Sequence, residues 1–221
     1  MKSFAAIATL AAVALSCAQA ATAPPIAVFV DFESQPSRES VLQMRTEIAA
    51  ILKPSGLSLD WHSLQDPQST QSYPDLVVLR FKGSCQVRNP PMDSELGPAI
   101  ESKALASTVV SDGHVLPFTD VKCNEIRRYL QSELLGRQTA KQEQIYGRAL
   151  GRVVAHELYH IFAATEEHAK EGVARSFHTR RDLTNKTFRF TEKETTKLHE
   201  LKWRALLTAE SEFLSLQIVT R

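Results

Sequence analysis

The sequence carries almost no net charge and, beyond its first twenty residues, no long hydrophobic run. Its 26 Lys and Arg residues are balanced by 25 Asp and Glu residues, which gives a formal net charge of +1. A near-neutral chain has no general electrostatic attraction for nucleic acid or for an anionic membrane surface. No later segment stays apolar for the length of a bilayer crossing. We therefore expect neither a nucleic-acid partner nor a transmembrane segment.

The N-terminus differs in kind from the rest of the chain. Lys2 is followed by an apolar run over residues 4–15 and then by Ala18-Gln19-Ala20. A basic residue, a short apolar run and an A-x-A site are typical of a secretory signal peptide. We predict export to the periplasm or the medium, with cleavage after Ala20.

A lipoprotein anchor is the alternative for this segment. Cys17 could carry the lipid, but Ala14 occupies the position where a lipobox usually has leucine. Short motifs of this kind often arise by chance, so cleavage is the preferred interpretation. The sequence is accordingly divided into a signal peptide, residues 1–20, and a single domain, residues 21–221.

Cysteine is also scarce. Removal of the signal peptide leaves only Cys85 and Cys123. Export places both in an oxidising compartment, where cysteines pair by default. Neither has a neighbour at the spacing of a metal-binding motif. We predict a Cys85–Cys123 disulfide, with two unrelated buried thiols as the alternative.

Hydrophobic periodicity predicts an α+β fold. Runs of β-branched and aromatic residues indicate strands, and apolar residues three and four apart indicate helices. Ser37 can cap the first helix, and Asp112-Gly113 can form a turn between two strands. The expected strands cover 26–32, 57–64, 76–81 and both sides of 112–113, and the expected helices cover 38–52, 120–136, 139–164 and 192–217.

The helix expected at 139–164 carries the motif His156-Glu157-x-x-His160. Residues four apart are neighbours on one helix face, so both imidazoles can bind one metal ion. Glu157 is rotated by about 100° from His156 and can reach a bound water without ligating the metal. This is the arrangement of a zinc hydrolase, in which zinc acidifies water and the carboxylate accepts its proton. A surface helix with two solvated histidines is the alternative.

The same helix has two other features. Leu150, Val154 and Leu158 form an apolar stripe beside the histidine face, which places the histidines between core and cleft. Gly147 and Gly151 weaken the helix. Either these glycines are simply tolerated, or another backbone, such as a strand beneath the site, approaches closely there.

The motif and the order of elements resemble the zincin metalloproteases, and particularly the metzincin clan, whose pattern is H-E-x-x-H-x-x-G-x-x-H. The resemblance implies a zincin-like fold, with a small mixed sheet packed on a helix, a long active-site helix and a C-terminal helix. It also implies His156 and His160 as zinc ligands and Glu157 as general base. The chain is similar as well to small exported bacterial zincin-like proteins of unassigned function, which share HELYH followed by a more distant histidine.

The sequence departs from the metzincin pattern after His160. Ala163 and Glu166 occupy the positions of the glycine and the last histidine, and no methionine follows Met92 to form a Met-turn. A catalytic zinc site usually has three protein ligands and an open position. We predict His168 as the third ligand, because a short turn after the helix can bring it back to the metal.

Other third ligands remain open. Glu166 is the next choice, and a glutamate of the last helix would give a likeness to the gluzincin branch instead. The remaining candidates are acids and a histidine that follow the motif: Glu167, Glu171, His178, Glu192 and Glu194.

The other titratable residues have more ordinary expected roles. His62 and His114 are expected to be half-exposed, His199 to be solvated and Tyr159 to pack in the core. A tyrosine that stabilises the transition state would have to be Tyr73 or Tyr129. The strand at 105–110 could border the cleft and pair with an extended substrate. An interior strand is the preferred interpretation of that segment.

We therefore expect an exported zinc-dependent hydrolase, most simply a peptidase that acts on peptides or proteins. Zn²⁺ is held by His156, His160 and His168, and Glu157 activates water. One alternative is a catalytically silent zinc-binding or partner-binding protein on the same fold. Another is an exported protein without metal, in which the motif is coincidental. The sequence sets neither the substrate nor the oligomeric state.

Overall fold

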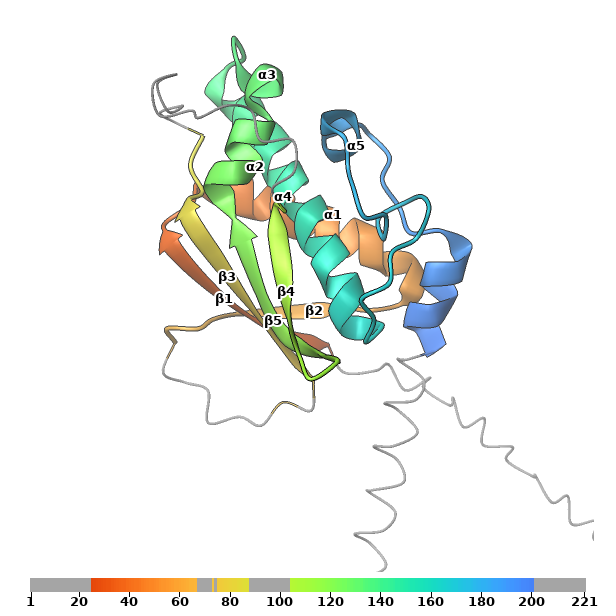
Figure 1. Cartoon of the computed structure of the whole chain (residues 1–221). Helices are drawn as coiled ribbons and strands as arrows, with labels where there is room; N and C mark the ends of the chain where they lie inside the picture. Colours follow the sequence, from red (N-terminus) through yellow and green to blue (C-terminus); the bar gives the residue numbers. More distant parts are fainter. Residues whose placement is uncertain (1–24, 67–72, 74, 88–103, 201–221) are drawn as a thin grey trace, which may run out of the picture.

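The computed structural model of the chain describes residues 25–66, 73, 75–87 and 104–200. A five-stranded sheet has the strand order β2-β1-β3-β5-β4 (Figure 1). The first four of these strands run parallel, and β4 runs antiparallel to β5. The strands are β1 Ile26–Ser34, β2 Leu59–Ser63, β3 Leu76–Ser84, β4 Ala106–Ser111 and β5 His114–Lys122. The predicted α+β class and mixed sheet are confirmed.

The helices expected at 38–52 and 139–164 are both present. As predicted, the side chain of Ser37 caps the first helix, accepting a hydrogen bond from the backbone N–H of Ser40 at 3.1 Å. A short 3₁₀ turn ends that helix, and residues 192–200 are also helical. The named helices are α1 Arg38–Leu52, α2 Cys123–Tyr129, α3 Gln131–Leu134, α4 Thr139–Phe162 and α5 Arg180–Thr184.

The prediction of one helix over residues 120–136 is wrong. The helix begins later than expected and is interrupted. Residues 120–122 belong to β5, where Asp120 is opposite Arg80 of β3 and forms an ion pair with it at 2.7 Å. The helix begins only at Cys123 and is interrupted at Leu130, between α2 and α3. Strand pairing with β3 therefore overrides the local helical pattern. Helix α5 was not expected.

Several expectations fall outside the described residues. They are the signal peptide, its cleavage after Ala20, the lipoprotein alternative at Cys17 and most of the last predicted helix. Among the described helices, none is both long and apolar enough to cross a membrane.

Helices α1 and α4 lie side by side against one face of the sheet (Figure 1). Their apolar faces and the facing strand residues form one core, with fully buried Ile48, Leu79 and Leu158 among its members. On the other face of the sheet, Ala27, Phe29 and Val78 form a small separate cluster. The main core therefore fixes α4 to the sheet, and with it the motif.

At its two glycines, α4 packs closely against the backbone of another helix. A Cβ atom at position 147 would lie 2.5 Å from the carbonyl oxygen of Ser40, and one at position 151 would lie 2.7 Å from that of Met44. The approaching backbone is therefore α1 and not a strand. Because the contact is with main-chain atoms, no side-chain rotation can relieve it.

The predicted disulfide is present. Cys85, just after β3, and Cys123, at the start of α2, are bonded and fully buried. The hydroxyl of Tyr146 on α4 donates a hydrogen bond of 3.1 Å to the carbonyl of Cys123. The disulfide thus joins the sheet to α2 in the interior, directly beside the helix that carries the motif.

We predict that Gly147→Ala lowers the free energy of unfolding by about 1–3 kcal/mol, because the added methyl group forces α1 and α4 apart. Helix propensity alone predicts the opposite sign, since alanine favours a helix by about 1 kcal/mol over glycine. Urea denaturation measures the difference. Lys141→Ala, at an exposed position of the same helix, is the control and should change stability by less than about 0.5 kcal/mol. A stabilised Gly147→Ala variant would contradict the close approach.

Candidate metal centre

Helix α4 holds His156 and His160 on one face near its C-terminal end. Their Nε2 atoms are 3.1 Å apart, and their rings meet nearly edge to face with centroids 4.7 Å apart. Ala155 and Leu158 on the neighbouring face are fully buried. The histidine pair therefore lies on a helix that packing holds in place, as the sequence predicted.

The chain reverses direction directly after α4. Ala163 occupies the glycine position of the motif pattern but has φ −86°, whereas Ala164 is left-handed with φ +43°. The backbone N–H of Thr165 then bonds to the carbonyl of His160 at 3.1 Å. The turn is thus made one residue later than the motif pattern has it, and by an alanine.

The returning chain supplies a backbone acceptor to each histidine of the pair. Nδ1 of His160 donates to the carbonyl of Thr165 at 2.7 Å, and Nδ1 of His156 donates to the carbonyl of Val173 at 2.8 Å. Such bonds fix the ring orientation and the tautomer, so that the proton sits on Nδ1 and the lone pair on Nε2. The two Nε2 atoms, 3.1 Å apart, are therefore the nitrogens left for a metal ion.

His168 completes the group. One nitrogen from each of His156, His160 and His168 lies within 4.8 Å of the other two. The ring of His168 stacks on that of His156 at 5.3 Å and meets that of His160 at 4.8 Å. His160 is buried and His168 is exposed. Three convergent imidazole nitrogens of this kind could hold one metal ion.

The surroundings of His156 and His168 favour the neutral form of both imidazoles. Burial lowers the pKa of His156 to about 3, with smaller contributions from the nearby rings of His160, His178 and His168, although the hydrogen bond to Val173 acts in the opposite direction. Burial also lowers the pKa of His168, assisted by His160. A metal ligand must be neutral imidazole, so the site does not have to lose these protons before it binds an ion.

Glu157 turns from α4 toward the sheet. Its Oε2 accepts a 2.7 Å hydrogen bond from the hydroxyl of Thr108 on β4, and that hydroxyl lies 3.0 Å from the hydroxyl of Thr119 on β5. Burial raises the pKa of the Glu157 carboxyl, whereas the bonds from Thr108 oppose the rise. Thr108 was not expected from the sequence. It is 49 residues from Glu157, and no local pattern links the two.

Strand β4 is an edge strand and not an interior one, so the preferred interpretation of the segment at 105–110 is wrong. Among the described residues it pairs with β5 alone, at the end of the sheet order, and its register is interrupted between Thr108 and Val110. The left-handed turn at Asp112 and Gly113 joins the two strands, as predicted. The strand borders the histidine group, since the side chain of Thr108 contacts Glu157.

A cavity of about 530 Å³ connects these parts. Its walls are β4 on one side, α4 with His156, Glu157 and His160 on the second, and the returning chain with His168 and residues 176–180 on the third. Residues of α2, including Tyr129, close one end. The histidine group and Glu157 therefore line one and the same cavity.

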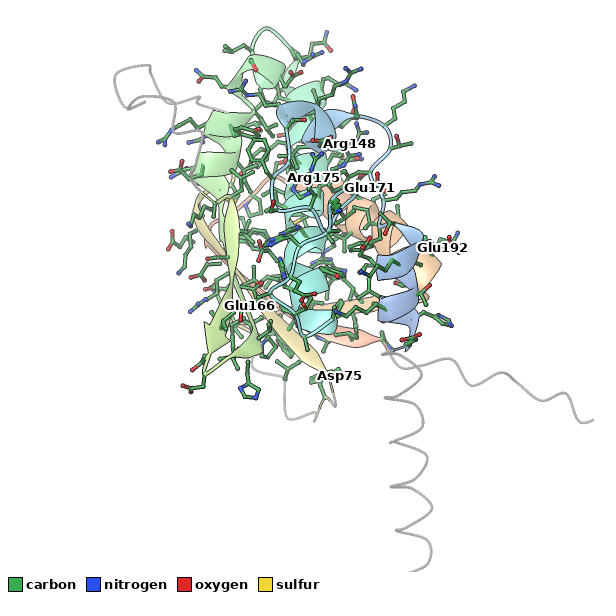
Figure 2. The ribbon with its side chains drawn as sticks, turned by 45° about the vertical axis from the view of Figure 1, so that its right-hand side comes forward. Asp75, Arg148, Glu166, Glu171, Arg175 and Glu192 are labelled. Atoms are coloured by element: carbon green, nitrogen blue, oxygen red, sulfur yellow. A yellow bond between two sulfur atoms is a disulfide. The ribbon has the colours of Figure 1, made fainter. Side chains whose placement is uncertain are left out.

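The other candidate third ligands lie apart from the group. His178 comes nearest, with its ring 5.2 Å from that of His156, but it does not belong to the group of converging nitrogens. Glu166 lines the same cavity, whereas Glu171 and Glu192 do not; Figure 2 shows these two on the other side of α4 from Glu166. Glu194 is buried and accepts a 2.9 Å bond from the backbone of Thr191, which makes it a helix cap.

A buried arginine ties the returning chain to α4. Arg152 has no exposed surface; its Nε donates to Glu47 of α1 at 2.7 Å. Its two Nη groups donate to the carbonyls of Asp182 and Asn185 at 2.5 and 2.6 Å. The guanidinium also lies 5.0 Å from the ring of Phe188. One side chain, a helical turn before His156, thus anchors the segment that follows His168 and His178.

The remaining tyrosines and histidines differ in whether they line the cavity or pack elsewhere. Tyr159 is buried against Phe190, which confirms its packing role. Tyr129 lines the cavity and donates a 2.9 Å bond to the carbonyl of His178, whereas Tyr73 packs on Phe29 at the other face of the sheet. His62, His114 and His199 lie away from the cavity, and the last two are exposed.

Comparison with models of known protein families gives no match, and comparison with curated proteins finds no similar sequence.

We predict that the protein binds one zinc ion per chain and that His168→Ala weakens binding by more than about a hundredfold. Even the loss of a hydrogen bond to a ligand costs about ten- to a hundredfold in affinity, and the loss of a ligand costs more. Competition with a chromogenic chelator measures the affinity. His178→Ala is the informative comparison and should retain the zinc. Weakened binding in His178→Ala together with normal binding in His168→Ala would contradict the assignment.

Proposed function

We propose that the protein is an exported zinc-dependent hydrolase, and specifically a zincin-like metallopeptidase. The observation that carries this proposal is the convergence of His156, His160 and His168 beside Glu157 at the wall of one cavity. Three ligands with an open side are typical of catalytic zinc sites, whereas structural sites are closed by four. The buried disulfide agrees with an oxidising compartment.

The residues present fit a zinc ion. With both Nδ1 atoms bonded to carbonyls, the Nε2 atoms of His156 and His160 are two acceptors facing each other at 3.1 Å. Two facing lone pairs repel unless a cation lies between or beside them. Neutral imidazoles with carbonyl-bonded Nδ1 atoms are the usual environment of zinc-binding histidines. A zinc ion held here would supply Lewis acidity, which polarises a carbonyl group and makes water easier to deprotonate.

The residues around the ion would then carry out the proton transfers and bind the substrate. Glu157 is placed to accept a proton from the attacking water and to pass it to the leaving amine. Thr108 orients the carboxylate, because its hydroxyl holds Oε2 at 2.7 Å and leaves the other oxygen for the water. Among the described residues the outer edge of β4 has no partner strand, and β4 lines the same cavity, which suits an extended peptide. The β4 edge is the reason for preferring a peptide to other carbonyl compounds.

The likeness to zincins also supports the proposal. The motif lies on a long helix beside an antiparallel edge strand, and the chain returns beneath the histidines. The sequence departs from the metzincin pattern after α4, and other residues make the turns there. The turn is made at Ala164, and Gly172, with φ +73°, allows Val173 to lie under His156. The next residue, Ala174, is buried. This returning segment contains no methionine, so it has no counterpart of the Met-turn.

We predict that Glu157→Gln lowers kcat for peptide hydrolysis by about 10²–10⁴, because the amide cannot accept a proton from water. Zinc content should be unchanged, since Glu157 is not a ligand. A fluorogenic peptide library incubated with the zinc-loaded protein measures the activity, and elemental analysis measures the metal.

Glu167→Gln is the matched control, because Glu167 is exposed and does not line the cavity. It should leave both activity and zinc content as they are. Zinc-loaded wild-type protein that cleaves no peptide in the library, or Glu157→Gln protein as active as the wild type, would contradict the proposed function.

A further inference from the structure

The end of the cavity that lies beyond the histidines has walls of its own. They are formed by Leu105 at the start of β4, Tyr129 and Arg128 at the end of α2, and Phe177 and Arg180 on the returning chain. Phe177 is 54% exposed and offers an apolar surface at the rim. Figure 1 shows α2 at the opposite end of β4 from the β4–β5 turn. These residues are the part of the cavity that the proposed catalytic chemistry does not use.

Two arginines face this end, and only one has its charge balanced. Nη1 of Arg128 donates to Glu125 at 2.9 Å, and both residues line the cavity. Arg180 forms no ion pair within the part of the chain that the structure describes. Its Nε donates to the carbonyl of Tyr129 at 2.7 Å, and its guanidinium lies 5.1 Å from the ring of Tyr129. Counted over the described residues, the end of the cavity at α2 therefore carries a net positive charge.

The contacts of Arg180 hold its side chain in one orientation and leave hydrogen-bond donors available for a ligand. Hydrogen bonding through Nε and stacking on Tyr129 set the plane of the guanidinium at the cavity wall. Both Nη groups have no hydrogen-bond partner among the described residues. A guanidinium with two parallel donors matches the two oxygens of a carboxylate, and an ordered one loses less conformational entropy on binding.

The opposite end of the cavity has the opposite charge. Glu166 lines the cavity just after α4, and Figure 2 shows it near the C-terminal end of that helix. It is exposed and forms no ion pair within the described part of the chain. The histidine group lies between Glu166 and the arginine end. An extended ligand along β4 is therefore favoured if its anionic group lies toward α2 and not toward Glu166.

We propose that the cavity selects a carboxylate at its α2 end and that Arg180 is the specificity-determining residue. The carboxylate is either an acidic side chain of the substrate or its free C-terminus, since both present the same two oxygens. This inference rests on the proposed function in taking a peptide as the ligand. The selection itself is a property of binding and can be measured without catalysis.

Binding of fluorescent nine-residue peptides to zinc-loaded Glu157→Gln protein tests the proposal. The first series carries one glutamate at each position in turn in an Ala/Ser background with an amidated C-terminus. The second series has glutamine at the same positions, and the third has glutamine and a free C-terminal carboxylate. Fluorescence anisotropy gives the dissociation constants.

We expect a glutamate at one position, or the free C-terminus, to bind about tenfold more tightly than its uncharged counterpart. Arg180→Gln should abolish this preference. Arg180→Lys should retain only part of it, because lysine keeps the charge and loses the paired donors. Arg181→Gln removes the same charge one residue along and does not line the cavity, so it should leave the preference unchanged.

Three results would overturn the proposal: equal binding of all three series, a preference that persists in Arg180→Gln, or no binding by any peptide. Zinc content measured in each variant shows that the metal centre is intact. If the carboxylate preference is found but zinc-loaded wild-type protein cleaves none of the peptides, the peptidase proposal fails and the binding inference stands.

Discussion

The return of the chain onto helix α4 is the constraint on which the candidate centre depends. The helix alone supplies two imidazoles, but their orientation is set by the carbonyls of Thr165 and Val173, which follow the helix. The same returning segment brings His168 to the pair. It is held in place by Arg152, which reaches from the helix to the carbonyls of Asp182 and Asn185. A buried guanidinium with all these partners is costly to disturb, because loss of any one partner leaves a buried charge or donor unsatisfied.

Much of this arrangement follows from the sequence where the signal is local. The motif helix, the Ser37 cap, the turn at 112–113 and the disulfide follow from periodicity, turn chemistry and the expected compartment. The close approach at Gly147 could be suspected from the sequence, but its partner could not. That partner is more than a hundred residues away, in α1. The proximity of His168 to the pair was anticipated from turn geometry alone.

The parts that could not be predicted depend on contacts between distant segments. The polar stretch before Cys123 fits a helical pattern, but pairing with β3 makes it a strand. Thr108 is an unremarkable strand residue until β4 lies at the edge of the sheet beside Glu157. The buried Arg152 resembles an ordinary helix arginine in the sequence. Each assignment is decided by tertiary packing, which a single sequence pattern does not encode.

The central claim is that three imidazoles hold a zinc ion with one side open. X-ray absorption at the zinc edge of the zinc-loaded protein tests it most directly. The account predicts three imidazole nitrogens at about 2.0–2.1 Å and one light oxygen ligand that exchanges with solvent. In His168→Ala protein loaded at high zinc concentration, one imidazole should be lost. Four protein ligands with no exchangeable position, or a spectrum of hexahydrated zinc only, would contradict the account.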